Sequence, residues 1–388
     1  MISAMPPRRP HVRAATGADS DAVTQVIDPA SDASGDAPAD PPGDAPADPP
    51  GDAPTDRTVG RRRRRIRRVL LITLLVLALL GGGGVLAVGW YAHSVDKDIK
   101  RVEAFNDVPV ESRPQKVAKN ALNFLVLGSD SRDPNNSSGS RSDTIILVHL
   151  SADHTSAQMV SIPRDTWTYV PRSKDGRQGN RQAKINAAFA WGGIPLTVQT
   201  VESYTGVRID HVALLDFSGF KEIIDALDGV EINVAEDFTS THSLNPNGKR
   251  TFQKGRQTMD GATALDYARE RYAFRDGDFT RIRHQQEVIK AVVEKASSGG
   301  LLANPARLNA FLRATSNAIS VDDTLDVFGM AMDLRHLRGD SLTFYTSPTK
   351  GTGQIGDESV VLPDVPKAKL FFDAIRRDAV ADIPQLAK

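Results

Sequence analysis

The 388-residue chain contains no cysteine. This absence excludes disulfide scaffolds, thiolate nucleophiles, iron–sulfur clusters and cysteine-ligated zinc sites. It does not decide the compartment, because a large domain outside the cytoplasm can fold without disulfides. The chain also lacks net charge, with 48 basic and 48 acidic residues. Its length is compatible with two or three domains.

The charges are spread unevenly along the chain. Residues 1–60 carry 10 Asp and 4 Arg but no Glu or Lys, which gives a net charge of −6. Residues 61–68, RRRRRIRR, hold seven Arg and no acid, and residues 69–388 hold 37 basic and 38 acidic residues. The large C-terminal part is therefore nearly neutral, and a general basic surface for nucleic acid is not expected there.

The first 60 residues contain 11 of the 23 prolines and an eight-residue repeat. The unit GDAPADPP occurs at 35–42 and 43–50 and is followed by GDAPTDRT at 51–58. A tract of Pro, Ala and Asp cannot bury enough apolar surface to offset its chain entropy. We therefore predict that residues 1–68, including the Arg run, form a disordered tail.

Residues 69–91 contain no charged side chain and begin with VLLITLLVLALL. As a helix these 23 residues would span roughly 34 Å, enough for a bilayer core of ~30 Å. The Arg run directly before them indicates a cytoplasmic N-terminus, and Trp90 and Tyr91 suit an interfacial aromatic belt. A cleaved signal peptide fits less well, because 68 residues precede the apolar run. The sequence predicts a single-pass transmembrane signal anchor with residues 92–388 outside the membrane.

Residues 92–119 are predicted to form a polar stalk, and residues 120–388 are predicted to form one extracytoplasmic domain. Strands are expected at 121–128, 143–150, 157–162, 209–217, 230–234 and 341–347. Helices are expected at 185–191, 195–204, 218–229, 260–270, 279–297, from 305 onward, 325–337 and 365–377, with Ser218, Asp260 and Asn304 as N-caps. Strands and helices intermingle, so we expect an α/β fold in which helices cover a central sheet.

Charged residues gather where the predicted strands and helices end. Asp130 and Asp143 flank the turn between the first two strands and could share a hard cation such as Mg²⁺. Five arginines and no lysine fall within fifteen residues: Arg269, Arg271, Arg275, Arg281 and Arg283. Arginine is preferred where phosphate oxygens need two-pronged donors.

Each of these features has an ordinary structural explanation. A strand-end Asp is more often a turn residue or an N-cap, and paired arginines often form solvated ion pairs. Their combination, in a chain without cysteine or a histidine cluster, indicates a site that handles a pyrophosphate by charge neutralisation.

Six motifs occur in the order and spacing of the LytR–CpsA–Psr family: NFLVLGSDSR, RSDTIILVHL, SIPRDTW, KINAAFAWGG, DGVEINV and MDGATALDYARERYAFRDGDFTRIRHQQ. The chain resembles that family over residues 120–295, and more loosely beyond them. The resemblance implies an α/β/α sandwich with a central mixed sheet and a long apolar pocket for a polyprenyl tail. It also implies transfer of a glycopolymer from undecaprenyl pyrophosphate to peptidoglycan, generally at a muramic acid 6-hydroxyl. Mg²⁺ (or Mn²⁺) at the pyrophosphate and a pyrophosphatase side activity are part of that expectation.

The resemblance assigns roles motif by motif. Asp130 and Asp143 match the metal-associated acids, and Asp143 is also expected to be catalytic. Five residues match the phosphate-binding arginines: Arg141, Arg164, Arg269, Arg271 and Arg281. Four further residues are expected to bind substrate: Lys184, Asn186, Arg283 and Gln285. His284 stands where the family commonly has Arg, and it is assigned no role.

The implied reaction is in-line attack of the acceptor hydroxyl on the sugar-side phosphorus, with undecaprenyl phosphate leaving. Asp143 or Asp278 could deprotonate the hydroxyl, and the sequence does not choose between them. An alternative is a non-catalytic protein that binds or senses lipid-linked cell-wall intermediates with the same arginines. A membrane-bound transcription regulator would need a DNA-reading domain, but residues 1–68 show no helix-turn-helix pattern. The expected partners are therefore the lipid-linked glycopolymer, peptidoglycan and the membrane, without nucleic acid.

Overall fold

The computed structural model describes residues 99–129, 142–241, 243, 248–334 and 337–387. The predicted tail at 1–68 and the predicted anchor at 69–91 lie outside these ranges, as do Asp130 and Arg141. Among the residues that are described, no helix is long and apolar enough to cross a membrane.

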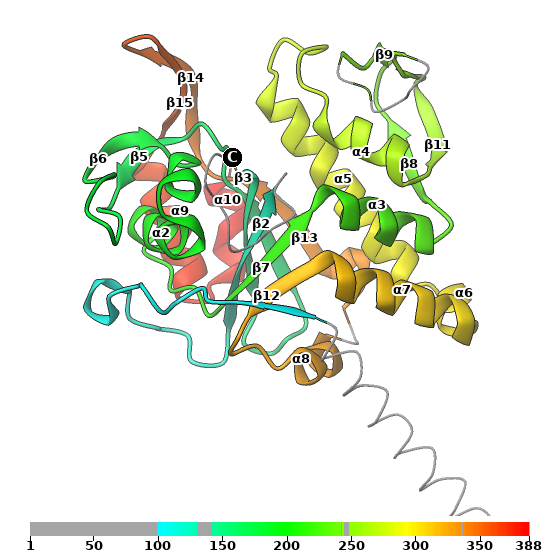
Figure 1. Ribbon diagram of the computed structural model, residues 1–388, viewed down its shortest axis with the longest axis horizontal. Coiled ribbons are helices and arrows are strands. Elements are labelled where there is room, and N and C mark those ends of the chain that lie inside the picture. The colour runs from blue at the N-terminus through cyan, green and yellow to red at the C-terminus, as the bar shows by residue number, and fades with distance from the viewer. Residues whose placement is uncertain (1–98, 130–141, 242, 244–247, 335–336, 388) are drawn as a thin grey trace, which may run out of the picture. The chain divides into compact units, whose positions relative to one another are not determined.

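A seven-stranded mixed sheet forms the centre of the domain, in the order β1-β12-β7-β2-β3-β4-β13 (Figure 1). The strands are β1 (Lys100–Val102), β12 (Ile319–Asp322), β7 (His211–Asp216), β2 (Leu122–Ser129), β3 (Ser142–Leu150), β4 (Ala157–Ser161) and β13 (Leu342–Thr346). β2 pairs antiparallel with β3 and parallel with β7, whereas β4 pairs antiparallel with β3 and parallel with β13. Central strands such as β3, SDTIILVHL, are rich in β-branched residues because both of their faces are covered. The predicted central mixed sheet is confirmed.

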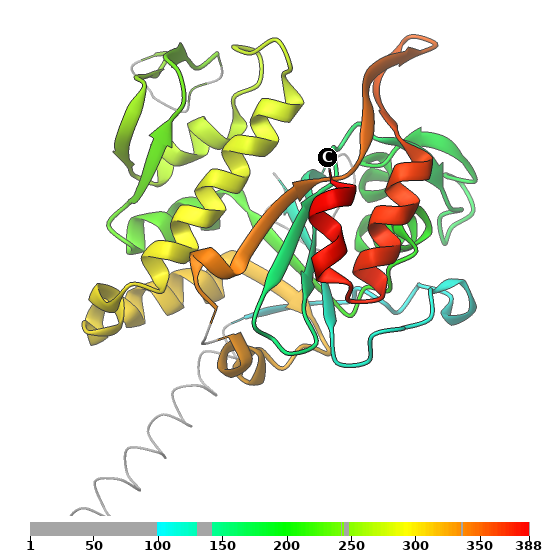
Figure 2. The same ribbon diagram turned by 180° about the vertical axis from the view of Figure 1, so that it is seen from behind.

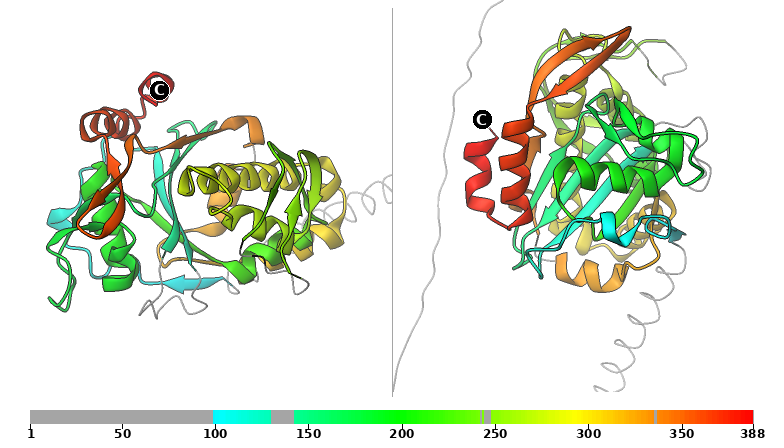
Figure 3. Two further views of the ribbon diagram at one scale, coloured as in Figure 1. Left: turned by 90° about the horizontal axis from the view of Figure 1, so that it is seen from above. Right: turned by 90° about the vertical axis from the view of Figure 1, so that its left-hand side faces the viewer.

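Helices cover both faces of this sheet (Figure 3). On one face α2 (Ala187–Thr205) and α9 (Val365–Arg376) enclose an apolar core that includes Leu125 and Leu147, both 0% exposed. On the other face lies α5 (Asp278–Ala296), from which Gln286 Nε2 donates to Ser161 Oγ and to Tyr345 O, each at 3.0 Å. The domain therefore has three layers, helix, sheet and helix, and the Gln286 side chain fixes α5 to β4 and β13.

A second apolar core lies behind α5, away from the sheet (Figure 2). Its elements are α3 (Phe217–Ala226), α4 (Gly261–Arg269), α7 (Pro305–Ala318), β8 (Val230–Val234) and β11 (Gly255–Met259). Further short elements are β9 (Phe238–Thr239), β10 (Thr251–Phe252), α6 (Gly299–Leu302), α8 (Val327–Asp333), α10 (Ile383–Leu386) and the 3₁₀ turns Val110–Ser112, Gly339–Ser341 and Val380–Asp382.

Local sequence signals predict where several helices begin or are interrupted. Asp260 Oδ1 accepts a hydrogen bond from the backbone of Thr263 at 2.8 Å and caps α4 as predicted, and Asn304 caps α7 in the same way. The two helices expected at 185–191 and 195–204 are the two parts of α2, which is interrupted at Gly192 and Gly193. α3 begins slightly earlier than predicted, because Asp216 rather than Ser218 provides the cap.

Two hairpins were not predicted from the sequence. β5 (Trp167–Val170) pairs with β6 (Arg181–Lys184), and β14 (Thr349–Ile355) pairs with β15 (Glu358–Pro363). Their strands are short or glycine-rich and lack a clear apolar alternation, as in β14, TKGTGQI. The backbone nitrogen of Val361 donates to Asp165 O at 2.8 Å, so the second hairpin is attached beside the first.

Residues 99–119 belong to the folded domain, whereas the sequence predicts a stalk up to residue 119. β1 extends the central sheet by pairing parallel with β12, and Val102, Ala104 and Val108 are buried in the core beneath α2 and α9. The three-residue strand KRV has no apolar pattern that would predict it. It forms by pairing with a strand more than 200 residues away in the chain.

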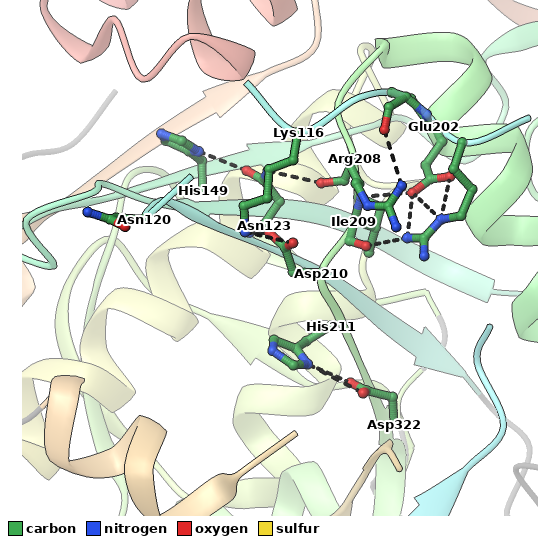
Figure 4. A network of polar contacts seen from close by, with 12 residues as sticks. Lys116, Asn120, Asn123, His149, Glu202, Arg208, Ile209, Asp210, His211 and Asp322 are labelled. Atoms are coloured by element: carbon green, nitrogen blue, oxygen red, sulfur yellow. Dashed lines mark hydrogen bonds and ion pairs between the residues drawn. The ribbon is translucent and has the colours of Figure 1, made fainter. Parts of the chain in front are cut away.

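A buried polar network fastens this N-terminal segment to the sheet (Figure 4). Arg113 Nη2 donates to Glu202 Oε1 at 2.8 Å, and Glu202 is only 2% exposed. Lys116 Nζ lies 2.8 Å from Asp210 Oδ1, and the other oxygen of Asp210 accepts from the backbone of Asn123. These contacts link residues before β2 to the segment between α2 and β7.

Candidate active site

Three arginines converge on Asp278, the first residue of α5. Arg281 Nη2 donates to Asp278 Oδ2 at 3.0 Å, Arg271 Nη1 lies 3.4 Å from Oδ1, and Arg164 Nε lies 3.7 Å from Oδ2. Arg281 is one turn along the same helix, whereas Arg164 follows β4 and Arg271 follows α4. The tertiary structure therefore gathers three of the predicted phosphate-binding arginines around one carboxylate.

Arg164 also contacts a second predicted site residue, Asp143 of β3. Its Nη1 donates to Asp143 Oδ1, and the Asp143 side chain is 29% exposed. The Nε atoms of Arg164 and Arg281 are buried without a hydrogen-bond acceptor among the described residues. A buried donor without a partner costs about 1–3 kcal/mol. Both guanidinium groups are therefore suited to an additional anionic acceptor.

The arginines of the cluster lie close enough to repel one another. Arg164, Arg271 and Arg281 face the two carboxylates of Asp143 and Asp278. Arg281 is 5% exposed, and its burial lowers the pKa of its guanidinium, an effect that Asp278 opposes and Arg164 reinforces. An anionic ligand would relieve this repulsion, which is what a phosphoryl-binding site requires.

Glu270 holds the loop that carries Arg271. Its Oε1 accepts from the backbone nitrogens of Arg271, Tyr272 and Ala273 at 2.9, 2.8 and 3.0 Å. Burial raises the pKa of the Glu270 carboxyl, but these bonds and those from Thr241 outweigh it, so the pKa lies below its ordinary value. Glu270 is thus an anchor for the backbone after α4.

Arg269 contacts a different group from the three arginines around Asp278. Its guanidinium carbon is 4.9 Å from the ring centroid of Phe217, at the start of α3. Within the described ranges no ion pair joins it to a carboxylate. Its contact is a cation–π interaction.

Lys184 and Asn186 lie beside Arg164, on the segment that leads into α2. Lys184 Nζ is 3.4 Å from Glu358 Oε2 and 3.9 Å from Asp165 Oδ1. The backbone nitrogen of Asn186 donates to Arg164 O at 3.2 Å. The predicted substrate-binding pair is therefore adjacent to the arginine cluster.

Arg283 and Gln285 have partners elsewhere. Arg283 is 56% exposed at its side chain and pairs with Asp276 at 2.8 Å, and Gln285 Nε2 donates to Ala268 O at 3.4 Å. His284 between them is buried, and its ring stacks on that of Tyr267 with a centroid separation of 4.0 Å. The structure describes no contact of Arg283 or Gln285 with Asp278. His284 belongs to the second apolar core.

Asp165 is a candidate functional residue that the sequence analysis did not select. Its side chain is 23% exposed, and it lies 3.7 Å from Arg164 Nε and 3.9 Å from Lys184 Nζ. Burial raises the pKa of its carboxyl, against the opposing effect of Arg164. Its position directly after Arg164, in SIPRD, was the available signal.

A cavity of about 1350 Å³ opens at the cluster. It exceeds the roughly 300–1,000 Å³ of a typical small-molecule site. Its lining on the cluster side includes Arg164, Asp165, Arg271 and Asp278. The β5–β6 hairpin, the N-terminal part of α2 and the β14–β15 hairpin complete the wall. The cavity can therefore hold a ligand larger than a pyrophosphate.

The predicted metal site is only partly contained in the described ranges. In these ranges no group of three or more His, Asp or Glu side chains is placed to hold a metal ion. Asp143 follows Ser142, which pairs with Ser129 in the β2–β3 ladder, and Asp130 comes directly after Ser129 in the chain. Carboxylate oxygens, completed by phosphoryl oxygens, form a donor set that suits Mg²⁺ or Mn²⁺.

Comparison with known proteins shows which family the chain resembles. A model of the LytR_cpsA_psr family matches residues 90–370. The cell wall biosynthesis protein LcpA of Corynebacterium glutamicum is 30% identical over 295 residues, which are 66% of this chain and 55% of LcpA. The polyisoprenyl-teichoic acid–peptidoglycan teichoic acid transferase TagT of Bacillus subtilis is 30% identical over 64% of this chain and 73% of TagT.

The crystal structure of Bacillus subtilis TagV has the same fold. It superposes with a TM-score of 0.54 and 26% identity, over 69% of this chain and 98% of the TagV chain. Of the relatives named here, the chain spans just over half of LcpA and about three quarters of TagT. The family model covers well over half of the chain. The family match, the fold and the ordered motifs together show that the chain belongs to the LytR–CpsA–Psr family.

Proposed function

We propose that this protein is a phosphotransferase that moves a glycopolymer from undecaprenyl pyrophosphate to peptidoglycan, at a muramic acid 6-hydroxyl. The observation that carries the proposal is the convergence of Arg164, Arg271 and Arg281 on Asp278 beside a large cavity. Planar guanidinium groups match the oxygens of a pyrophosphate. The name of the relative TagT describes the same class of donor and acceptor.

The face of the sheet toward α5 supports a lipid-linked donor. Phe124 pairs with Val148 and Val148 with Met159, so these three side chains share one face. Ser161, two residues after Met159, lies on that face and contacts Gln286 of α5. The three apolar side chains are only half-buried, although they lie between two layers. Partly exposed apolar side chains of this kind suit contact with a polyprenyl tail.

The proposed reaction is an in-line displacement. The acceptor oxygen forms a bond to the sugar-side phosphorus, and the bond from that phosphorus to the bridging oxygen breaks. Undecaprenyl phosphate then leaves with the electron pair. Arg164, Arg271 and Arg281 neutralise the charge that spreads over the phosphoryl oxygens. Water in place of the acceptor would give the pyrophosphatase side activity.

The proton of the acceptor hydroxyl needs a nearby base. Asp143 and Asp278, the two sequence candidates, are both engaged by arginine side chains. Asp165 lines the cavity, and its nearest cationic nitrogens, at 3.7 and 3.9 Å, lie beyond hydrogen-bonding distance. We therefore propose that Asp165 is the base and that its Oδ1 or Oδ2 accepts the proton of the acceptor hydroxyl.

A divalent cation completes the proposal. Asp143, together with Asp130, would hold Mg²⁺ or Mn²⁺, and the ion would neutralise charge on the pyrophosphate. Asp143→Asn should lose most transfer activity while the thermal unfolding temperature stays near that of the parent. Full activity in excess chelator would remove the metal from the proposal.

Transfer by the purified full-length protein is the decisive test. Polyprenyl-pyrophosphate-linked polymer and peptidoglycan are supplied, and both the polymer bound covalently to peptidoglycan and the released undecaprenyl phosphate are measured. Undecaprenyl phosphate should form in at least the amount of the bound polymer, and any excess should equal the free polymer phosphate that the pyrophosphatase side activity releases. Tight donor binding without either product would instead support the non-catalytic binding or sensing protein.

The proposal includes a location in the cell membrane. Residues 1–68 would be cytoplasmic and residues 69–91 would be the single anchor, which keeps the site close to a donor in the outer leaflet. A reporter that is active only outside the cytoplasm should be active when fused after residue 100. Activity of a cytoplasmic reporter at that position would reverse the topology and contradict the proposed function.

A further inference from the structure

The cavity has a second wall that the phosphate chemistry does not use. Trp167 of β5, Trp191 of α2 and Gln182 of β6 line it, together with Glu358 at the start of β15. These are aromatic and polar side chains, on elements other than those that carry Arg271 and Asp278. This aromatic wall, defined by Trp167, Trp191, Gln182 and Glu358, therefore needs its own explanation.

The β5–β6 register places Trp167 and Gln182, which both line the cavity, on one face of the hairpin. Trp167 pairs with Lys184 and Tyr169 pairs with Gln182, so these four side chains share one face of the hairpin. The opposite face carries Ala183, which is buried in a small core with α2. Ala183 and Arg181 line the cavity as well, so it extends along β6 past both faces of the hairpin and reaches Trp191 on the side of α2.

Trp191 is held at the end of the first part of α2. The guanidinium carbon of Arg181 lies 4.6 Å from its ring centroid, a cation–π contact that orients the indole. Gly192 directly after it departs from helical geometry, and a Cβ there would lie 2.6 Å from Leu196 Cβ. Trp191 is half-buried and lines the cavity, so its ring is not merely a part of the apolar core.

The chemistry of the aromatic wall matches a sugar ring. An indole offers a flat apolar surface to the C–H face of a pyranose, while amide and carboxylate groups bind its hydroxyls. A lipid tail would place apolar carbon against the polar groups of Gln182 and Glu358. The cavity volume of about 1350 Å³ leaves room for sugars beside a pyrophosphate.

We propose that the aromatic wall is a pyranose-binding subsite in which Trp167 and Trp191 contact a sugar next to the reacting phosphate. The inference rests on the proposed function for the reaction that this sugar undergoes. The sugar belongs either to the glycopolymer of the donor or to the peptidoglycan acceptor, and both present the same pyranose chemistry.

The chain offers a direct optical test. It contains three tryptophans, Trp90, Trp167 and Trp191, so the full-length Trp90→Phe protein reports only on the aromatic wall. Three probes are titrated: the disaccharide N-acetylglucosaminyl-N-acetylmuramic acid, N-acetylglucosamine 1-phosphate, and inorganic pyrophosphate. We expect saturable changes of tryptophan emission with the disaccharide if the acceptor occupies the subsite, or with the sugar phosphate if the donor does.

Substitutions then separate the sugar from the phosphate. In calorimetric titrations, Trp167→Ala should raise the Kd of the responding sugar at least about tenfold, roughly 1.4 kcal/mol. Trp167→Phe should recover part of the affinity, because it keeps an aromatic face. The Kd of pyrophosphate should stay within about twofold. Tyr169→Ala is the matched control, since Tyr169 is 41% exposed on the same hairpin face but does not line the cavity.

Kinetics distinguish failure of this inference from failure of the proposed function. Trp167→Ala should raise the KM of the sugar-bearing partner more than it lowers turnover. If neither sugar binds saturably, or Trp167→Ala leaves every sugar affinity unchanged, the subsite is overturned, while loss of transfer in Arg164→Ala would still uphold the proposed function. If the parent protein transfers no polymer, the proposed function fails, and saturable sugar binding by fluorescence would still support the subsite.

Discussion

The Nε atom of Arg164 lies 3.7 Å from Oδ2 of Asp278. Arg164 follows strand β4 of the central sheet, and Asp278 begins α5, the helix that packs on one face of that sheet. The contact therefore joins the sheet to α5 at the cavity. Asp278 also receives Arg271 and Arg281, which makes it the centre of the arginine cluster. We expect the function of the cluster to depend on how α5 is seated against the sheet.

Arg164→Ala should lower turnover by at least about 10², because one lost electrostatic donor typically costs about 10²–10³ in rate and a transition-state arginine more. Arg164→Lys should retain only part of the turnover, since a point charge cannot form the two-pronged contact. Single-turnover transfer and donor affinity are measured on the same folded variants. Arg256→Ala, 78% exposed at its side chain and paired with Glu231, is the control. An equal loss of donor affinity and overall efficiency with unchanged turnover would mean that Arg164 only holds the donor.

Asp165→Asn should lower turnover by about 10²–10⁴, the usual contribution of a general base. Burial raises the pKa of the Asp165 carboxyl above the ordinary 3.8, and the reaction needs the ionised form. Turnover should therefore fall as the pH drops through this raised pKa, and that acidic limb should be missing in Asp165→Asn. Arg164, Lys184 and Asp278 are the charged neighbours that modulate it. A pH–rate profile of the same shape in both proteins would exclude Asp165 as the base.

His284 should make folding stability depend on pH. Burial lowers its pKa from 6.5 to about 4, so the unfolded chain takes up a proton more readily than the folded one. Its contribution is fully present above pH 6.5 and is lost as the pH falls from there toward 4. The free energy of unfolding should decrease by about 2 kcal/mol between about pH 7 and about pH 5 from this residue alone. Chemical unfolding at both pH values should show a smaller decrease for His284→Phe, and an identical decrease would contradict the assignment.

The Arg113–Glu202 pair should stabilise the attachment of the N-terminal segment. Arg113→Ala leaves the buried carboxylate of Glu202 without its charged partner, which typically costs about 3–5 kcal/mol. Lys174→Ala is the matched control, because Lys174 is 76% exposed and pairs with Asp107 at the surface, where about 0–1 kcal/mol is expected. Urea unfolding measures both. Similar small losses for the two variants would show that residues 99–119 contribute little to the stability of the domain.

Local features of the sequence were sufficient for much of the fold. The aliphatic run in β3 predicts a buried strand, and Asp260 and Asn304 predict helix starts, because strand patterns and caps depend on residues only a few positions apart. The same local reading separated the two parts of α2 at its glycines. The resemblance to a family, carried by ordered motifs, added the candidate arginines.

Tertiary structure alone decided which candidates meet. Arg164 and Arg271 reach Asp278, whereas Arg283 turns to Asp276 and Gln285 to Ala268, although all of them lie in recognisable motifs. Side-chain direction depends on how α5 packs, and that packing involves Ser161 and Tyr345 from distant strands. β1 has a related cause, since it forms only through long-range pairing with β12. The strands of the two unpredicted hairpins pair with their neighbours in the chain, but they lack a clear apolar alternation, so no periodic signal marked them.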